Sequence, residues 1–181
     1  MTFAVRDGAL CMAATIDSMA DNTVPDLCVR AAGDADRPRL IPLINAAFAI
    51  ETFLEITRTD EERLAAMMAK GTVLMAEDDS GHLLGSVYTE LRGTRGYLGM
   101  LAVDPVHQGS GVGRGLLAEA ERRFRTQGCE AVDITVLSLR PELPPIYRRL
   151  GFIETGTEEF AGARDLKPGL ECHCIVMSKK L

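Results

Sequence analysis

Apolar positions recur along the chain with two periods, one typical of strands and one typical of amphipathic helices. Helical spacing predicts three helices, from Asp34 or Asp36 to Phe48, from Thr59 to Gly71, and from Val112 past Phe124. Apolar runs bounded by turn residues predict six strands, over residues 28–32, 72–77, 82–92, 97–103, 131–138 and 171–178. Strands and helices that alternate in this way predict a single α/β domain around a central sheet.

The third helix joins strands 97–103 and 131–138, and it dictates how they pair. A right-handed helical crossover makes such strands parallel, so we expect these two to be neighbours in the sheet. The hairpin around Asp78-Asp79-Ser80-Gly81 makes its two strands antiparallel. The sheet should therefore be mixed.

The first two helices carry local signals for their ends. Thr59-Asp60-Glu61-Glu62 forms a capping box that begins at Thr59, and Gly71 marks the end of the same helix. The first helix accepts Pro38 in its first turn, whereas Pro42 is expected to kink it.

The most informative segment is Gln108-Gly109-Ser110-Gly111-Val112-Gly113-Arg114-Gly115, with four glycines between a buried strand and an amphipathic helix. Backbone N–H groups at a helix start lack intrahelical partners and face the positive end of the helix dipole. Glycines let an anion approach these groups closely, so we expect a phosphate-binding loop. The alternative is a tight turn that binds nothing.

Glycine spacing narrows the choice of phosphate ligand. A dinucleotide-binding loop would need a glycine where Arg114 stands. A nucleoside triphosphatase would need Gly-Lys-Ser or Gly-Lys-Thr, and the sequence contains neither. An enzyme that binds ATP or NAD at this loop is therefore a remote alternative.

Composition and charge exclude several classes of protein. The chain has 181 residues and a formal net charge of −6, which fits one globular domain and argues against a nucleic-acid partner. Residues 8–16 form an apolar run too short to span a membrane and poor as a signal sequence, and no longer run approaches a membrane span. We therefore expect no membrane partner.

The five cysteines predict free thiols in a cytoplasmic protein, because their number is odd and their spacing has no disulfide framework. Cys172-His173-Cys174 suggests a metal site at first sight. In a strand, however, the two cysteines share one face and His173 points to the other, so we expect no metal.

Gln108, Gly111 and Gly113 fit the pattern Gln-x-x-Gly-x-Gly, and here the chain resembles the GNAT superfamily of acyl-CoA-dependent N-acyltransferases. The segment from Pro144 to Phe152, which ends in Leu-Gly-Phe, looks like the family's short fourth helix. The resemblance covers residues 28–181 and leaves residues 1–27 as an N-terminal extension. This segment is a mobile extension, a helix that packs on the domain or on a partner, or the product of a misassigned start site, and the sequence does not choose among these. It implies a mixed sheet of about six to seven strands with flanking helices, in which the parallel pair splays apart at a bulge, for which Gly99 is a candidate.

The resemblance also implies acetyl-CoA as cosubstrate and a primary amine as acceptor. In the family, the glycine loop holds the pyrophosphate and the preceding strand offers amides to the acyl carbonyl and pantetheine. Ser138 stands where relatives often carry asparagine. The residues that the resemblance assigns to acetyl-CoA are Leu101, Ala102, Val103, Gln108, Gly109, Ser110, Gly111, Val112, Gly113, Arg114 and Ser138.

The chemistry requires a proton for the leaving thiolate and a neutral attacking amine. Tyr147 in the fourth helix matches the family tyrosine near the thioester sulfur, which makes it the candidate general acid. The position of the family's strand glutamate corresponds to Tyr97 or Gly99, so Glu90 is the tentative base. Glu51, Glu55 and His173 remain alternatives, as does an amine that arrives neutral.

Taken together, the sequence predicts an N-acetyltransferase acting by direct attack in a ternary complex, on a small molecule rather than a protein. The alternative is an acyl-CoA-binding sensor or interaction domain without turnover. Homodimers are frequent in the resembled family, so a homodimer is compatible with this prediction.

Overall fold

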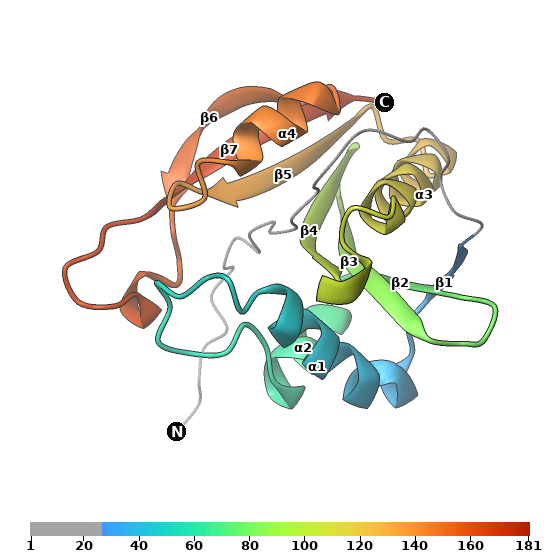
Figure 1. Ribbon diagram of the computed structural model, residues 1–181. Coiled ribbons are helices and arrows are strands. Elements are labelled where there is room, and N and C mark those ends of the chain that lie inside the picture. Colours follow the sequence, from blue (N-terminus) through green and yellow to red (C-terminus); the bar gives the residue numbers. More distant parts are fainter. Residues whose placement is uncertain (1–26) are drawn as a thin grey trace.

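The computed structural model describes residues 27–181, in which seven strands form one sheet of order β1-β2-β3-β4-β5-β7-β6 (Figure 1). Nearly all of the expected N-terminal extension, including the apolar run at 8–16, lies outside the described residues. The strands are β1 (Cys28–Ala31), β2 (Thr72–Glu77), β3 (Leu83–Arg92), β4 (Arg95–Val103), β5 (Ala131–Leu137), β6 (Ile153–Glu159) and β7 (His173–Lys180).

The helices are α1 (Arg37–Ala47), α2 (Glu61–Met68), α3 (Val112–Thr126) and α4 (Leu143–Arg149), together with the 3₁₀ turns η1 (Asp34–Asp36), η2 (Pro105–His107) and η3 (Ala163–Asp165). Both α1 and α3 pack against β3 and β4. All residues of β4 after Arg95 are buried, as expected for a strand at the centre of the core. No helix within residues 27–181 is long and apolar enough to cross a membrane.

The predicted parallel pair is present, and its strands separate part-way along their length (Figure 1). Residues 95–98 of β4 pair with residues 131–134 of β5, and the register ends at Leu98 and Ile134. Both strands continue beyond that point, β4 to Val103 and β5 to Leu137. The prediction of a mixed sheet with a splayed parallel pair is therefore confirmed.

The bulge lies one residue later than predicted. Gly99 pairs in register with Tyr88, whereas the β3–β4 register shifts between Ser86 and Tyr88. Met100 follows Gly99 and has a φ of 49°, in the left-handed region that a side chain rarely adopts. Holding a residue other than glycine there costs about 1–3 kcal/mol, so the surrounding contacts must stabilise this conformation.

Two other predictions need correction. The N-cap of α2 is Asp60 and not Thr59, because the Asp60 side chain accepts from the backbone N–H of Arg63 at 2.8 Å. Strand β6 was not predicted at all. Every residue of β6 is exposed and the strand lies at the edge of the sheet, so it lacks the apolar alternation that identifies a strand in sequence.

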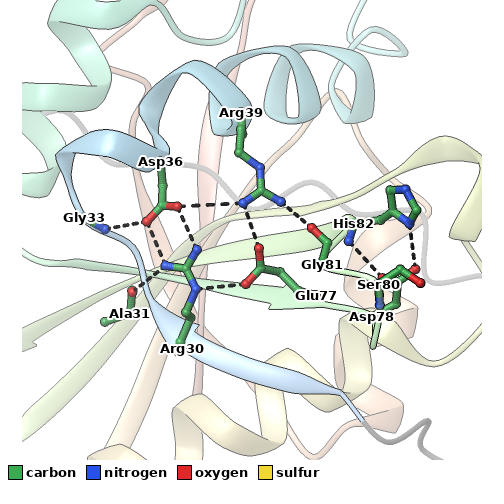
Figure 2. Close-up of polar contacts among 10 residues, drawn as sticks. All are labelled: Arg30, Ala31, Gly33, Asp36, Arg39, Glu77, Asp78, Ser80, Gly81 and His82. Carbon is green, nitrogen blue, oxygen red and sulfur yellow. Dashed lines mark hydrogen bonds and ion pairs between the residues drawn. The ribbon is translucent and has the colours of Figure 1, made fainter.

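A network of ion pairs fastens β1 to the start of α1 and to the β2–β3 turn (Figure 2). Arg30 donates to both oxygens of Asp36 at 2.8 Å and to Glu77 at 2.9 Å. Arg39 donates to Glu77 at 2.8 Å and to the carbonyl of Gly81 at 2.7 Å. The hydrogen bonds from Arg30 lower the pKa of Asp36 to about 2, so this carboxylate stays charged in the folded protein.

Candidate active site

The glycine loop connects the end of β4 to the first turn of α3, as the sequence predicts. Gly109 and Gly111 have φ values of 80° and 91°, which only glycine adopts without strain. Gly111 is the N-cap of α3, so the following N–H groups begin a helix without intrahelical acceptors. Gln108 donates from its amide to the carbonyl of Val103 at 3.4 Å and ties the loop to the strand end.

The remaining loop residues differ in what they present. Val112 is buried and its side chain belongs to the core, which leaves only its backbone for a ligand. The Ser110 hydroxyl donates to the carbonyl of His107 at 2.6 Å and closes the turn. Arg114 is half-buried in the first turn of α3, where a cation would complement a bound phosphate.

The end of β4 directs one backbone N–H toward the split. Asp104 donates its N–H to the carbonyl of Leu84 in β3 at 2.9 Å. Neighbouring residues in a strand direct their N–H groups to opposite edges, so the N–H of Val103 faces the β5 side. Register with β5 has already ended there, at Leu98.

Tyr147 lies in α4 and is fully buried in the main core. Its ring packs edge-to-face on Phe152, with centroids 5.8 Å apart, and Phe152 donates its N–H to the carbonyl of Tyr147 at 3.0 Å. Gly151, at φ 92°, makes the reversal between them. The Leu-Gly-Phe motif therefore holds the tyrosine in place at the end of α4.

Glu90 lies in the closed part of the sheet, away from the split. It pairs with Tyr97 in register, and its carboxylate accepts from Arg92 at 3.1 Å and from the Tyr88 hydroxyl at 3.0 Å. Burial alone would raise the pKa of Glu90, but the hydrogen bonds from Arg92 and Tyr88 and the charges of Arg92 and Lys70 together outweigh it, and the pKa is lowered. The role of Glu90 as a base stays a prediction, and its carboxylate accepts hydrogen bonds from Arg92 and Tyr88.

Glu51 has a different environment, in the segment between α1 and α2. Its side chain is 1% exposed, and its two oxygens face Arg58 at 3.5 Å and Arg140 at 3.2 Å. Burial raises the pKa of Glu51 against the opposing effect of both arginines. A buried carboxylate with a raised pKa, close to the end of β5, has the properties of a general base.

Arg58 connects this carboxylate to the bulge, because its Nε donates to the sulfur of Met100 at 3.2 Å. Neither Arg58 nor Arg140 stood out in the sequence. Arg140 and Glu51 are 89 residues apart, and no local pattern of residue types links them. Only the folded structure brings them together.

The other candidates lie further along β5 and β7. The Ser138 hydroxyl accepts from the N–H of His173 at 3.1 Å and lies 3.7 Å from the sulfur of Cys172, so Ser138 fastens β5 to β7. Its proposed contact with acetyl-CoA remains a prediction. Glu55 and His173 are exposed. An open cavity of about 470 Å³ is lined by His173 and Cys172 together with Glu158, Glu159 and Phe160.

Residues 27–181 contain no group of three His, Cys, Asp or Glu side chains that could hold a metal ion. As strand geometry predicts, Cys174 is buried while His173 is exposed. Burial raises the pKa of the Cys174 thiol to about 12, so this cysteine is a poor nucleophile and a poor ligand.

The loop before α2 and the loop before β7 contact each other near the end of β5. Leu54 and Leu166 make an isolated antiparallel bridge, flanked by backbone hydrogen bonds from Glu55 to Asp165 at 2.8 Å and from Lys167 to Phe53 at 2.9 Å. Leu166 belongs to a second small hydrophobic cluster with Phe160 and Leu137, and Leu54 packs against this cluster. The segments before α2 and before β7 are thus held against each other.

The sequence model of the acetyltransferase (GNAT) domain family matches residues 40–165 of this chain. This match covers more than half of the chain and includes the glycine loop, the split and α4. The chain belongs to the GNAT acetyltransferase family. Its relatives include the mycothiol acetyltransferases of Propionibacterium freudenreichii subsp. shermanii, 34% identical over 90 residues, and of Saccharopolyspora erythraea, 34% identical over 87 residues. These alignments cover 48% and 47% of this chain but only 29% and 28% of those proteins, which are much longer.

Solved structures of GNAT acetyltransferases share the fold over most of this chain. The ribosomal-protein-alanine N-acetyltransferase of Brucella melitensis is 26% identical, with a TM-score of 0.66 over 86% of this chain and 100% of that one. A phosphinothricin acetyltransferase of Sinorhizobium meliloti, solved with acetyl-CoA, is 19% identical, with a TM-score of 0.67 over 86% of this chain and 88% of that one. The second likeness concerns the fold alone.

Proposed function

We propose that this GNAT domain, residues 28–181, transfers the acetyl group of acetyl-CoA to a primary amine by direct attack in a ternary complex. The observation that carries the proposal is that three features occur together: a glycine loop at a helix start, a parallel strand pair that separates beside it, and a buried tyrosine on the following helix. A phosphate-binding turn without the split and the tyrosine would support only anion binding.

The loop fits the pyrophosphate of acetyl-CoA. The N–H groups after Gly111 would hold it, with Gln108, Gly109, Ser110, Gly113 and Arg114 around them. A Cβ at the left-handed Gly111 would strain the cradle, which explains the glycine there. Backbone groups of Leu101, Ala102 and Val103 would meet the pantetheine arm and acyl carbonyl, and Ser138 would flank it from β5.

Tyr147 is the proposed general acid. Its hydroxyl would donate a proton to the thiolate of coenzyme A as the carbon–sulfur bond breaks, while the amine forms the new carbon–nitrogen bond. The N–H of Val103, directed to the split, would stabilise the negative charge that develops on the carbonyl oxygen. A phenol has a pKa of about 10 in water and can therefore protonate a leaving thiolate.

The base takes the one proton that the amine nitrogen loses when it becomes an amide; the sequence predicts Glu90 for this role, and Glu51 is the better candidate. Both carboxylates are bound by arginine, but the pKa of Glu90 is lowered, which weakens it as a proton acceptor. Burial makes Glu51 more basic, and it lies beside Arg58, which contacts the bulge residue Met100.

The acceptor is proposed to be a small molecule rather than a protein. By their names, the matched relatives and solved structures are acetyltransferases of mycothiol, a ribosomal protein and phosphinothricin, so family membership alone does not identify the acceptor. The cysteines among residues 27–181 are free, which supports the proposal of a cytoplasmic location. The net charge of −6 argues against a nucleic-acid partner. The homodimer and the absence of a membrane partner also remain predictions.

Calorimetric titration with acetyl-CoA tests the glycine loop from Gln108 to Gly115 as the binding site. ATP and NAD, titrated separately, are the control ligands. Wild type should bind acetyl-CoA alone, and Gly111→Asp should abolish binding. Gly128→Asp is the matched control, because Gly128 also has a positive φ of 78° but follows the opposite end of α3. Absence of acetyl-CoA binding in wild type refutes the proposal. Binding without turnover on a panel of amines would favour the sensor alternative.

A further inference from the structure

The split between β4 and β5 has no register pairs beyond Leu98 and Ile134, yet its two sides are joined further along by buried charges. We call Arg58, Glu51 and Arg140 the Glu51 network. The side chains of these three residues are 10%, 1% and 5% exposed. Buried charges at a site of this kind need a reason, because desolvation offsets much of their mutual attraction.

The network reaches one side of the split through Met100. Arg58 donates from Nε to the Met100 sulfur at 3.2 Å and also stacks on Phe48, with 4.7 Å from the guanidinium carbon to the ring centroid. Met100 carries the strained φ of 49° that forms the bulge. Leu101, Ala102 and Val103 follow directly, so a shift of Met100 would redirect their N–H groups.

The network reaches the other side through Arg140. Its backbone N–H donates to the carbonyl of Leu137 at 2.9 Å, at the end of β5, and its carbonyl accepts from Leu143 at 3.1 Å, at the start of α4. Arg140 therefore lies in the turn that connects β5 to the helix of Tyr147. Its Nε also binds Glu142, which fixes the guanidinium plane.

Glu51 joins these two arginines with one oxygen each, Oε2 toward Arg58 and Oε1 toward Arg140. We propose that the Glu51 network positions the reacting groups, by holding the bulge of β4 and the β5–α4 turn at a fixed separation. This inference rests on the proposed function for its catalytic consequence. The two arginines act through Met100 and through α4, so they are positioning residues.

Arginine itself does not accept protons near neutral pH, but both arginines lower the pKa of Glu51, so kcat is compared on the high-pH plateau, where Glu51 is deprotonated in every variant. Arg58→Met and Arg140→Met keep much of the side-chain length and remove the charge. Both should lower kcat by about 10- to 100-fold while the Kd for acetyl-CoA changes less than about threefold, since misplacement by about 1 Å has effects of this size. Arg58→Lys and Arg140→Lys should recover part of kcat.

Arg30→Met is the matched control. Arg30 also binds two carboxylates, Asp36 and Glu77, but in the network that joins β1, α1 and β2. This variant should lower the melting temperature and leave kcat unchanged. A loss of kcat in Arg30→Met equal to that in Arg140→Met would overturn the proposal.

Amide hydrogen exchange on the free protein gives a readout independent of catalysis. Arg58→Met and Arg140→Met should raise exchange by about tenfold over residues 100–103 and 137–143, and Arg30→Met should not. If wild type fails to bind acetyl-CoA, the proposed function fails while exchange still tests the network. Unchanged exchange and unchanged kcat refute the positioning role, as does raised exchange with unchanged kcat. Where a methionine variant does not fold, the lysine variant is measured in the same way, and Glu51→Gln is measured by hydrogen exchange only.

Discussion

The hydroxyl groups of Tyr97 and Thr135 lie 2.9 Å apart and join β4 to β5 where the two strands begin to separate. Thr135 is the first residue of β5 after the last parallel pair, Leu98 with Ile134. Both side chains are buried, and Arg92 stacks on the Tyr97 ring at 3.7 Å. Side-chain hydrogen bonding thus continues the contact between the strands one residue beyond the backbone register.

Tyr97→Phe keeps the ring and removes this hydrogen bond, so it should lower the free energy of unfolding by about 1 kcal/mol. The melting temperature should fall by about 2–4 °C for a domain of this size. A double-mutant cycle with Thr135→Val, measured by urea unfolding, should give a coupling energy above about 0.5 kcal/mol. Additive effects of the two changes would show that the pair does not stabilise the base of the split.

Tyr147→Phe tests the proposed general acid. The ring can keep its edge-to-face packing on Phe152, so the melting temperature should stay close to that of wild type. Loss of the proton donor should lower kcat by about 100-fold or more, with little change in the Kd for acetyl-CoA. A variant that retains kcat within about twofold would show that the thiolate leaves without a proton from Tyr147.

The pH dependence of kcat/KM separates the two candidate bases. A base must be deprotonated to act, so activity falls as the pH drops through its pKa. Burial raises the pKa of Glu51 above its ordinary value, whereas the pKa of Glu90 is lowered. If Glu51 is the base, the acid limb lies above the ordinary carboxylate range, and Glu51→Gln removes it.

Two controls apply to that measurement. Amines of different pKa distinguish the enzyme from the acceptor, because only a limb that stays in place belongs to the enzyme. Glu90→Gln should leave the limb unchanged if Glu51 is the base. Loss of the limb in Glu90→Gln alone would return the assignment to Glu90.

The parts of the fold that follow from local patterns were predictable from the sequence. The loop from Gln108 to Gly115 and the parallel strands on either side of α3 are examples, because glycine spacing and a helical crossover fix them locally. Strand β6 escaped prediction because all of its residues are exposed, and its pairing with β7 rather than its own pattern makes it a strand.

The details of the candidate site depend on contacts between distant segments. Glycine adopts bulge conformations easily, so the sequence predicts the bulge at Gly99. The left-handed residue is Met100, and its sulfur accepts a hydrogen bond from Arg58. In the same way, Glu51 looks like any carboxylate in a loop until Arg58 and Arg140 enclose it. Burial and pairing of charges are tertiary properties, which no spacing of residue types along the chain encodes.

Gly96 in β4 illustrates how closely the C-terminal end of α3 packs on the closed part of the sheet. A Cβ at Gly96 would lie 2.6 Å from the ring of Phe124, closer than real contacts allow, while a Cβ at Gly156 in β6 would meet nothing within 4 Å. Gly96→Ala should therefore destabilise the protein by about 1–3 kcal/mol through overpacking, measured by urea unfolding. Gly156→Ala is the matched control and should be neutral or stabilising, because it only restricts the unfolded chain. Equal stability of the two variants would mean that α3 moves away from β4 at little cost.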